Sequence, residues 1–160
     1  LAALFYLSRR NDESIELCQK VLNLNPDFVM ARVFLARAYT QKGMNDAAIG
    51  ELRSTSASTS RDPRILGVLG CALAAAGMIK DAEEVLTELR ELSTTQYVPP
   101  YYVALVHAAL GQKDLAFESL HQASEDRALD LRFLRLDPAL DTLRSDPRFD
   151  ALLRKINVGS

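Results

Sequence analysis

The stretch that decides the fold runs from Gly111 to Ala123 and reads GQKDLAFESLHQA. Related stretches begin 34 residues earlier at Gly77 and another 34 residues earlier at Gly43. In each of them the glycine is followed five positions later by an alanine, which gives Ala48, Ala82 and Ala116. A fixed period of this length, with amphipathic patterns on both sides of the glycine, is typical of stacked helix–turn–helix units. We therefore expect an all-α solenoid.

The repeat register predicts how the chain is divided. The array covers residues 1–127 and comprises a truncated first repeat, 1–26, and repeats at about 27–62, 63–96 and 97–127. Residues 128–157 break the period and are predicted to form C-terminal capping helices, because an open solenoid must cover its last apolar face. Residues 158–160 are a tail. Since the first repeat lacks the start of its first helix and the chain has no initiator Met, we expect the C-terminal part of a longer protein.

Four pairs of Asn or Asp followed by Pro mark predicted helix starts, because a capping side chain before proline suits the first helical turn. They are Asn25-Pro26, Asp62-Pro63, Asp137-Pro138 and Asp146-Pro147. Gly67 and Gly70 fall inside a predicted helix, where glycine costs about 1 kcal/mol relative to alanine. A close approach of two helices accounts for Gly70, and the sequence offers no account of Gly67. The Ser/Thr-rich residues 54–60 predict a linker, with a modification site as the alternative.

The net charge and the absence of known catalytic motifs exclude several classes of function. A formal net charge of −2 gives no electrostatic reason to expect a nucleic acid or an anionic membrane as partner. No apolar run approaches the length of about 18 residues that suggests a membrane-spanning helix. The chain has no phosphate-binding loop, zinc-protease motif or nucleophile elbow. We therefore expect no catalysis, no cofactor and no bound metal, and a cytoplasmic protein.

Three side chains that could carry chemistry have simpler interpretations. Cys18 and Cys71 belong to different repeats, and this separation argues against a disulfide. His107 stands where the earlier repeats have Tyr39 and Leu73. We expect a packed, hydrogen-bonded core histidine there rather than a catalytic base.

The pattern resembles the tetratricopeptide repeat family, whose units carry Leu-Gly and an aromatic residue in the first helix, glycine at the turn and a small alanine in the second helix. The matching residues are Phe5, Ser14, Cys18, Val21 and Pro26; Leu35, Ala36, Tyr39, Gly43, Ala48 and Leu52; Leu69, Gly70, Gly77, Ala82 and Leu86; and Val103, Ala104, Gly111, Ala116, Leu120 and Ala123. The departures are the absence of Trp, Arg9 in place of glycine, Thr55 in place of the last alanine, and His107 in place of the aromatic residue. The segment from Leu136 to Phe149 is similar to the end of many bacterial repeat proteins.

The resemblance implies antiparallel helix pairs in a right-handed superhelix, with the first helices lining a concave groove that accepts a partner's helix or extended peptide. The side chains expected in this groove are Tyr6, Met30, Val33, Arg37, Thr40, Arg64, Cys71, Val98, Tyr101 and Leu105, with the small Ala3, Ala74 and Ala108. Tyr and Arg most often carry binding energy at interfaces; packing and solvation are the alternative roles. The Lys/Asn pattern with which some relatives clamp a C-terminal carboxylate is absent.

We therefore expect a non-catalytic scaffold that binds a protein or peptide. Two alternatives remain open. One is a self-association module that forms a homo-oligomer through the open N-terminal face around Leu1, Leu4 and Phe5. The other is a regulatory C-terminal tail of a larger bacterial enzyme or transcription regulator.

Overall fold

The computed structural model describes residues 1–54 and 61–158, and within them the chain forms helices and no strand. The α-helices are α1 (Ala2–Leu7), α2 (Asn11–Leu24), α3 (Val29–Gln41), α4 (Asn45–Arg53), α5 (Pro63–Ala75), α6 (Ile79–Leu92), α7 (Pro100–Ala109), α8 (Lys113–Glu125) and α9 (Pro147–Val158). Two 3₁₀ segments, η1 (Leu129–Phe133) and η2 (Pro138–Leu143), lie between α8 and α9. The all-α prediction is confirmed. The predicted linker lies, apart from Ser54, outside the described residues.

The two helices of each pair are joined by a turn that contains one residue in the left-handed backbone conformation. Gly43, Gly77 and Gly111 have φ angles of 73°, 78° and 74°. The residue after each glycine donates its N–H to the carbonyl five positions before it, as in a Schellman stop. Arg9 occupies the same place in the first pair and has a φ of 61°. The turn therefore persists there, although a side chain makes this conformation cost roughly 1–2 kcal/mol.

Three of the four predicted helix starts are confirmed, and one is wrong. The capping bonds run from the N–H of Arg64 to Asp62 at 2.9 Å, of Ala139 to Asp137 at 3.0 Å and of Arg148 to Asp146 at 3.0 Å. Asn25 instead ends α2, and α3 begins at Val29 rather than at Pro26. The N–H of Phe28 binds the carbonyl of Asn25, so the intervening residues form a turn.

Two glycines let α5 and α7 approach closely. A Cβ on Gly70 would lie 2.8 Å from a methyl carbon of Val106, and a Cβ on Gly67 would lie 2.6 Å from the Cβ of Tyr102. Contacts this short do not occur between real side chains, so alanine would push the two helices apart. The expected close approach at Gly70 is confirmed, and the same contact accounts for Gly67.

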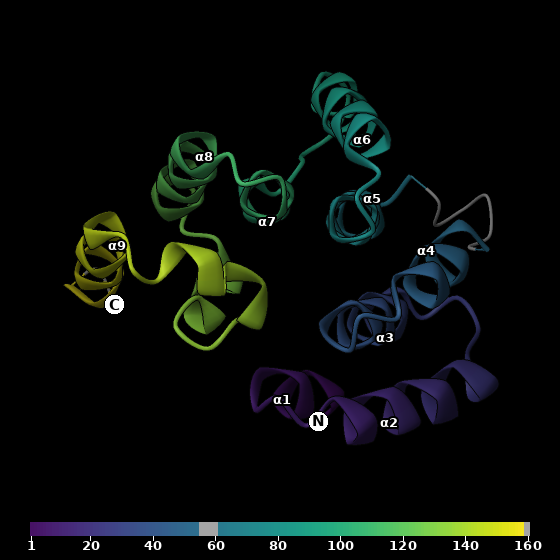
Figure 1. Ribbon diagram of the computed structural model, residues 1–160. Helices are drawn as coiled ribbons and strands as arrows, with labels where there is room; N and C mark the ends of the chain where they lie inside the picture. Colours follow the sequence, from purple (N-terminus) through teal and green to yellow (C-terminus); the bar gives the residue numbers. More distant parts are fainter. Residues whose placement is uncertain (55–60, 159–160) are drawn as a thin grey trace.

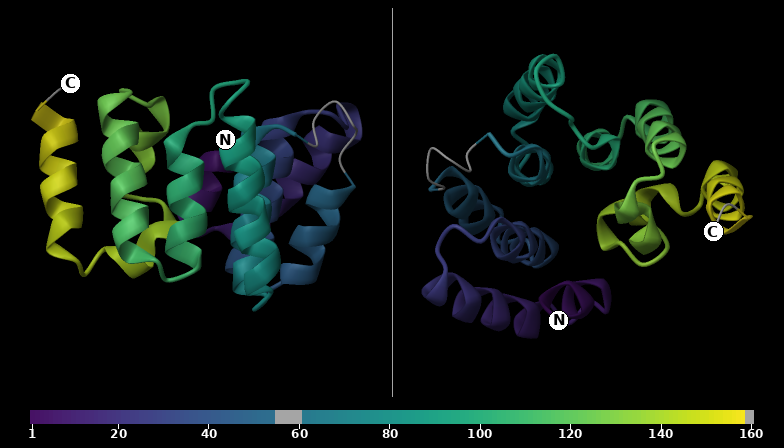
Figure 2. Two further views of the ribbon diagram at one scale, coloured as in Figure 1. Left: turned by 90° about the horizontal axis from the view of Figure 1, so that it is seen from above. Right: turned by 180° about the vertical axis from the view of Figure 1, so that it is seen from behind.

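The helix pairs follow one another along an arc, with α3, α5 and α7 on its inner side and α4, α6 and α8 on its outer side (Figure 1). We call the inner side, lined by α1, α3, α5 and α7, the concave surface. Residues 129–143, with both 3₁₀ segments, turn back toward this surface, whereas α9 packs beside α8 (Figures 1 and 2). We call residues 129–143 the inner segment.

The described helices are all too short or too polar to cross a membrane. The cytoplasmic location stays a prediction.

Candidate functional site

Asp137 of the inner segment lies at the centre of the concave surface. Its Oδ2 accepts hydrogen bonds from Nη2 of Arg37 in α3 and from the hydroxyl of Tyr101 in α7. Its Oδ1 accepts from the hydroxyl of Tyr6 in α1 at 3.3 Å, in addition to the N–H of Ala139. Asp137 is 1% exposed and Arg37 is 7% exposed. Helices from three different pairs therefore hold one carboxylate.

The electrostatics of this site favour a charged pair. Burial raises the pKa of Asp137. The charge of Arg37 and the hydrogen bonds that the carboxylate accepts lower it by more, so the pKa lies below its ordinary value. Burial raises the pKa of Tyr101, which keeps its hydroxyl protonated as a donor. The guanidinium of Arg37 also lies over the rings of Tyr6, 4.6 Å from the centroid, and of Phe34, 5.6 Å away. The buried cation is thus compensated by both a carboxylate and aromatic faces.

Asp141 joins the inner segment to the turn that follows α1. It accepts hydrogen bonds from Nη2 of Arg9 at 2.8 and 3.0 Å and from Nε of Arg144 at 2.6 Å. The Arg9–Asp141 pair is exposed, so it contributes about 0.2–1 kcal/mol. Arg144 also donates to the backbone carbonyls of Asp137, at 3.0 Å, and Arg135. These bonds shape the loop that presents Asp137.

Little space remains between the inner segment and the helices. A cavity of about 20 Å³ lies beside Tyr6, Arg37, Thr40, Cys71 and Leu105. It has room for about one water molecule. The Nε of Arg37 is buried and has no hydrogen-bond partner within the described part of the chain. The concave surface at this point is therefore filled by the chain's own C-terminal segment.

The inner segment lies where the family resemblance predicts a peptide-binding groove. Of the predicted groove side chains, Tyr6, Arg37 and Tyr101 meet at Asp137, and Thr40, Cys71 and Leu105 line the small cavity. They lie on the concave surface, but the inner segment covers them because its carboxylate satisfies the buried Arg37. That they bind a partner stays a prediction.

The other predicted groove residues lie elsewhere. Nη1 of Arg64 contacts the sulfur of Met30 at 3.4 Å, while its Nη2 pairs with Asp62 at 2.6 Å. Val33 is fully buried in the core. Val98 lines a separate pocket between α6, α7 and α8. These four predicted side chains are not part of the Asp137 site.

Asp137 is absent from the predicted site, because the sequence suggests only its role at a helix start. The sequence around Asp137 nevertheless indicates that this residue lies close to the core. Leu131, Leu134, Leu140 and Leu143 flank it and are at most 5% exposed. A segment that buries leucines on both sides of an aspartate lies against the core, and an aspartate that is itself buried there requires a buried partner.

The remaining candidates for chemistry show structural roles. Nδ1 of the half-buried His107 lies 2.7 Å from Oε1 of Gln112. Cys18 and Cys71 are free thiols, and burial raises their pKa to about 11 and about 12, so both stay protonated and unreactive. Across residues 1–54 and 61–158, no three His, Cys, Asp or Glu side chains are grouped so as to hold a metal ion.

Comparison with known families gives one match. Residues 6–71 match the family described as tetratricopeptide repeat. No curated protein and no solved structure matched the chain. Repeats of this family generally mediate protein–protein interactions. The consecutive helix pairs and the glycine turns 34 residues apart agree with this match and continue the same pattern beyond residue 71.

Proposed function

We propose that this chain is a non-catalytic interaction scaffold that binds a peptide or helix of a partner protein on its concave surface. The inner segment occupies this surface until the partner displaces it. The observation that carries the proposal is the seating of Asp137: a short piece of chain already lies there, held by side chains of α1, α3 and α7. A partner that presents an acidic residue between apolar ones can make the same contacts.

A partner must displace the inner segment before it binds, and this requirement lowers its apparent affinity for the concave surface. If its docking is favourable by about 3 kcal/mol, the open state makes up roughly 1 part in 150 of the molecules, and the apparent Kd of a partner rises by that factor. An intrinsic Kd of about 10 nM then appears as about 1.5 µM. A scaffold closed in this way responds to strong or abundant partners and ignores weak ones.

The test uses a peptide with the chain's own sequence. A fluorescein-labelled peptide of residues 134–143 is added to the full chain and to an Asp137→Asn variant, in which the inner segment loses its charge. We expect fluorescence anisotropy to show binding to the variant and not to the parent, because only the variant has a free concave surface. A peptide that itself carries Asn in place of Asp137 should not bind.

Two further variants sharpen this test. Asp150→Asn removes an exposed carboxylate from α9 and should behave like the parent. Arg37→Met in the Asp137→Asn background should abolish binding of the peptide. Hydrogen exchange of the amides of residues 129–143 reports whether the inner segment has opened. An opened variant that binds no peptide would contradict the proposal.

A second candidate function, self-association, is favoured by the N-terminal end of the array. Leu1 and Leu4 are 75% and 57% exposed. A mainly apolar pocket of about 480 Å³ lies between α1, α2 and α3, and Leu1, Phe28 and Phe34 are among the residues that line it. If two copies pair through this end, light scattering will show a mass that rises with concentration, and Leu4→Glu will abolish the rise. A monomer at all concentrations excludes this function.

A further inference from the structure

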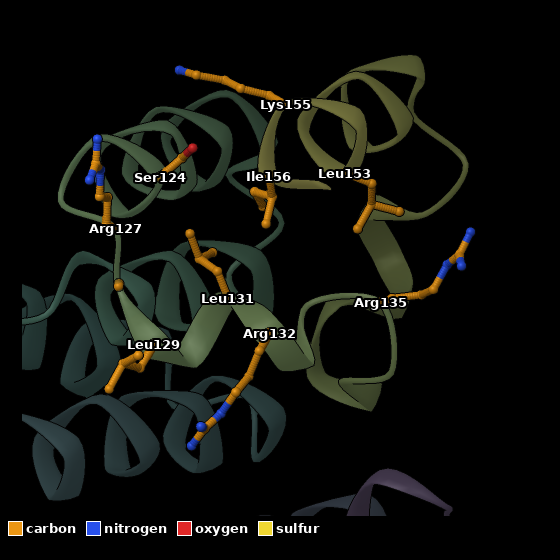
Figure 3. Close-up of a pocket in the computed structure, with 10 residues that line it drawn as sticks. Ser124, Arg127, Leu129, Leu131, Arg132, Arg135, Leu153, Lys155 and Ile156 are labelled. Atoms are coloured by element: carbon orange, nitrogen blue, oxygen red, sulfur yellow. The ribbon is translucent and has the colours of Figure 1, made fainter. Parts of the chain in front are cut away.

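A second pocket lies away from the Asp137 site, where the end of α8, η1 and α9 meet. Its volume is about 630 Å³. Figure 3 shows Leu131, Leu153 and Ile156 gathered between the 3₁₀ segment and α9. Leu131 is 5% exposed, whereas Leu129 at the edge is 76% exposed. The pocket therefore has a recessed apolar floor and one projecting leucine.

The charged side chains around this floor are all basic. They are Arg127, Arg132, Arg135 and Lys155, and no Asp or Glu lines the pocket. Figure 3 shows them extending from different elements around the apolar centre. Among residues 1–54 and 61–158, no ion pair involves any of the four. Four unpaired cations are a local excess in a chain whose net charge is −2.

Arg127 also has an unusual backbone conformation. It follows α8 with a φ of 53°, a value that favours glycine. A residue with a side chain is strained in this region, and such strain concentrates at functional sites. The chain thus keeps a cation beside the pocket at a position where glycine would be free of strain.

We propose that this pocket is an interaction surface for an acidic, amphipathic segment of a partner protein, which places an apolar side chain on the leucine and isoleucine floor and its carboxylates against the four cations. The charges are complementary, and each carboxylate meets a cation that forms no ion pair within the described part of the chain. No aromatic side chain lines the pocket, which disfavours stacking of nucleic-acid bases. The floor is recessed, whereas a membrane surface would require apolar side chains that project into lipid.

This pocket is separate from the Asp137 site, although residues 129–135 of the inner segment contribute to its lining. Within the described residues, no side chain that lines the pocket is hydrogen-bonded to Asp137, and none was predicted as a groove residue. The segment that binds here differs from the inner segment in needing several acidic residues rather than one buried carboxylate. A failure of one proposal therefore leaves the other intact.

The test measures anisotropy of a fluorescein-labelled peptide of alternating glutamate and leucine pairs, added to the full chain. A lysine–leucine peptide and a glutamate–serine peptide serve as comparison probes. We expect binding of the glutamate–leucine peptide alone, weakening as salt rises. The double variant Arg135→Glu, Lys155→Glu should weaken it by about tenfold or more, since two attractions become repulsions. Leu129→Ser should weaken it severalfold.

Two controls match these variants. Arg154→Glu reverses an exposed charge next to Lys155 that does not line the pocket, and Leu24→Ser alters an 89% exposed leucine at the other end of the array. Both should bind like the parent. The proposal is overturned if Arg154→Glu weakens binding as much as the double variant does. It is also overturned if the lysine–leucine peptide binds equally well, or if only phosphatidylserine vesicles bind.

Discussion

Removing the charge of Asp137 should release the inner segment while the repeats stay folded. Asp137→Asn keeps an oxygen for the N–H of Ala139 but leaves the guanidinium of Arg37, whose side chain is 8% exposed, without its counter-ion. Breaking one partner of a buried pair typically costs about 3–5 kcal/mol. Arg37→Met leaves the carboxylate buried instead and should cost a similar amount. In the double variant no charge is left unpaired, so its cost should fall below the sum of the single costs by at least about 2 kcal/mol.

The assay is urea unfolding followed by circular dichroism, together with hydrogen exchange of residues 129–143. For a slope of about 2 kcal/mol per molar urea, a loss of 3 kcal/mol lowers the midpoint by about 1.5 M. If the inner segment opens alone, exchange accelerates in it first and the helical signal changes little. The reasoning is refuted if the two substitutions add within about 0.5 kcal/mol, because the side chains would then not act as a pair.

Three further predictions test the packing and the titration. Ala116→Leu should destabilise the chain by about 1–3 kcal/mol through overpacking, and an unchanged melting temperature would show that α8 is packed differently. Gly70→Ala should destabilise because of the clash with Val106, whereas Gly50→Ala, with no atom within 4 Å of its added Cβ, should stabilise by about 0.5–1 kcal/mol in the same melting assay. The lowered pKa of Asp137 contributes stability above the unfolded value of about 3.9, which is lost as the pH falls through the folded pKa. Exchange of residues 129–143 should accelerate in acid below about pH 4, and Asp137→Asn should remove this step.

The sequence predicts the repeats well because their signal is local. A left-handed turn needs glycine, so Gly43, Gly77 and Gly111 mark three turns without any knowledge of packing. Asp62 and Asp146 mark helix starts for the same local reason. Where a predicted helix start is wrong, as at Asn25, the error is about one helical turn, because asparagine can cap the start of a helix and can also follow its end.

The inner segment could not be predicted in the same way. Its position depends on contacts between Asp137 and side chains 36, 100 and 131 residues away in the sequence. The family resemblance predicts which helices face inward, and it places Arg37 and Tyr101 there. It carries no information on whether another part of the chain covers them, because that depends on how residues beyond the repeats fold back.

η1 belongs both to the inner segment and to the lining of the basic pocket, so we expect ligands of the two proposed surfaces to compete. Leu129, Leu131 and Arg132 of η1 line the basic pocket, while Asp137 a few residues later anchors the inner segment on the concave surface. If a partner displaces the inner segment, η1 moves with it and the basic pocket loses part of its floor. An acidic ligand in that pocket must then stabilise the closed state and weaken binding on the concave surface. The effect is reciprocal: in one and the same chain, each of the two peptides lowers the affinity for the other by the same factor. Asp137→Asn favours the open state and should therefore lower the affinity for the glutamate–leucine peptide. Equal binding of the glutamate–leucine peptide to parent and variant would show instead that η1 keeps its place when the concave surface opens.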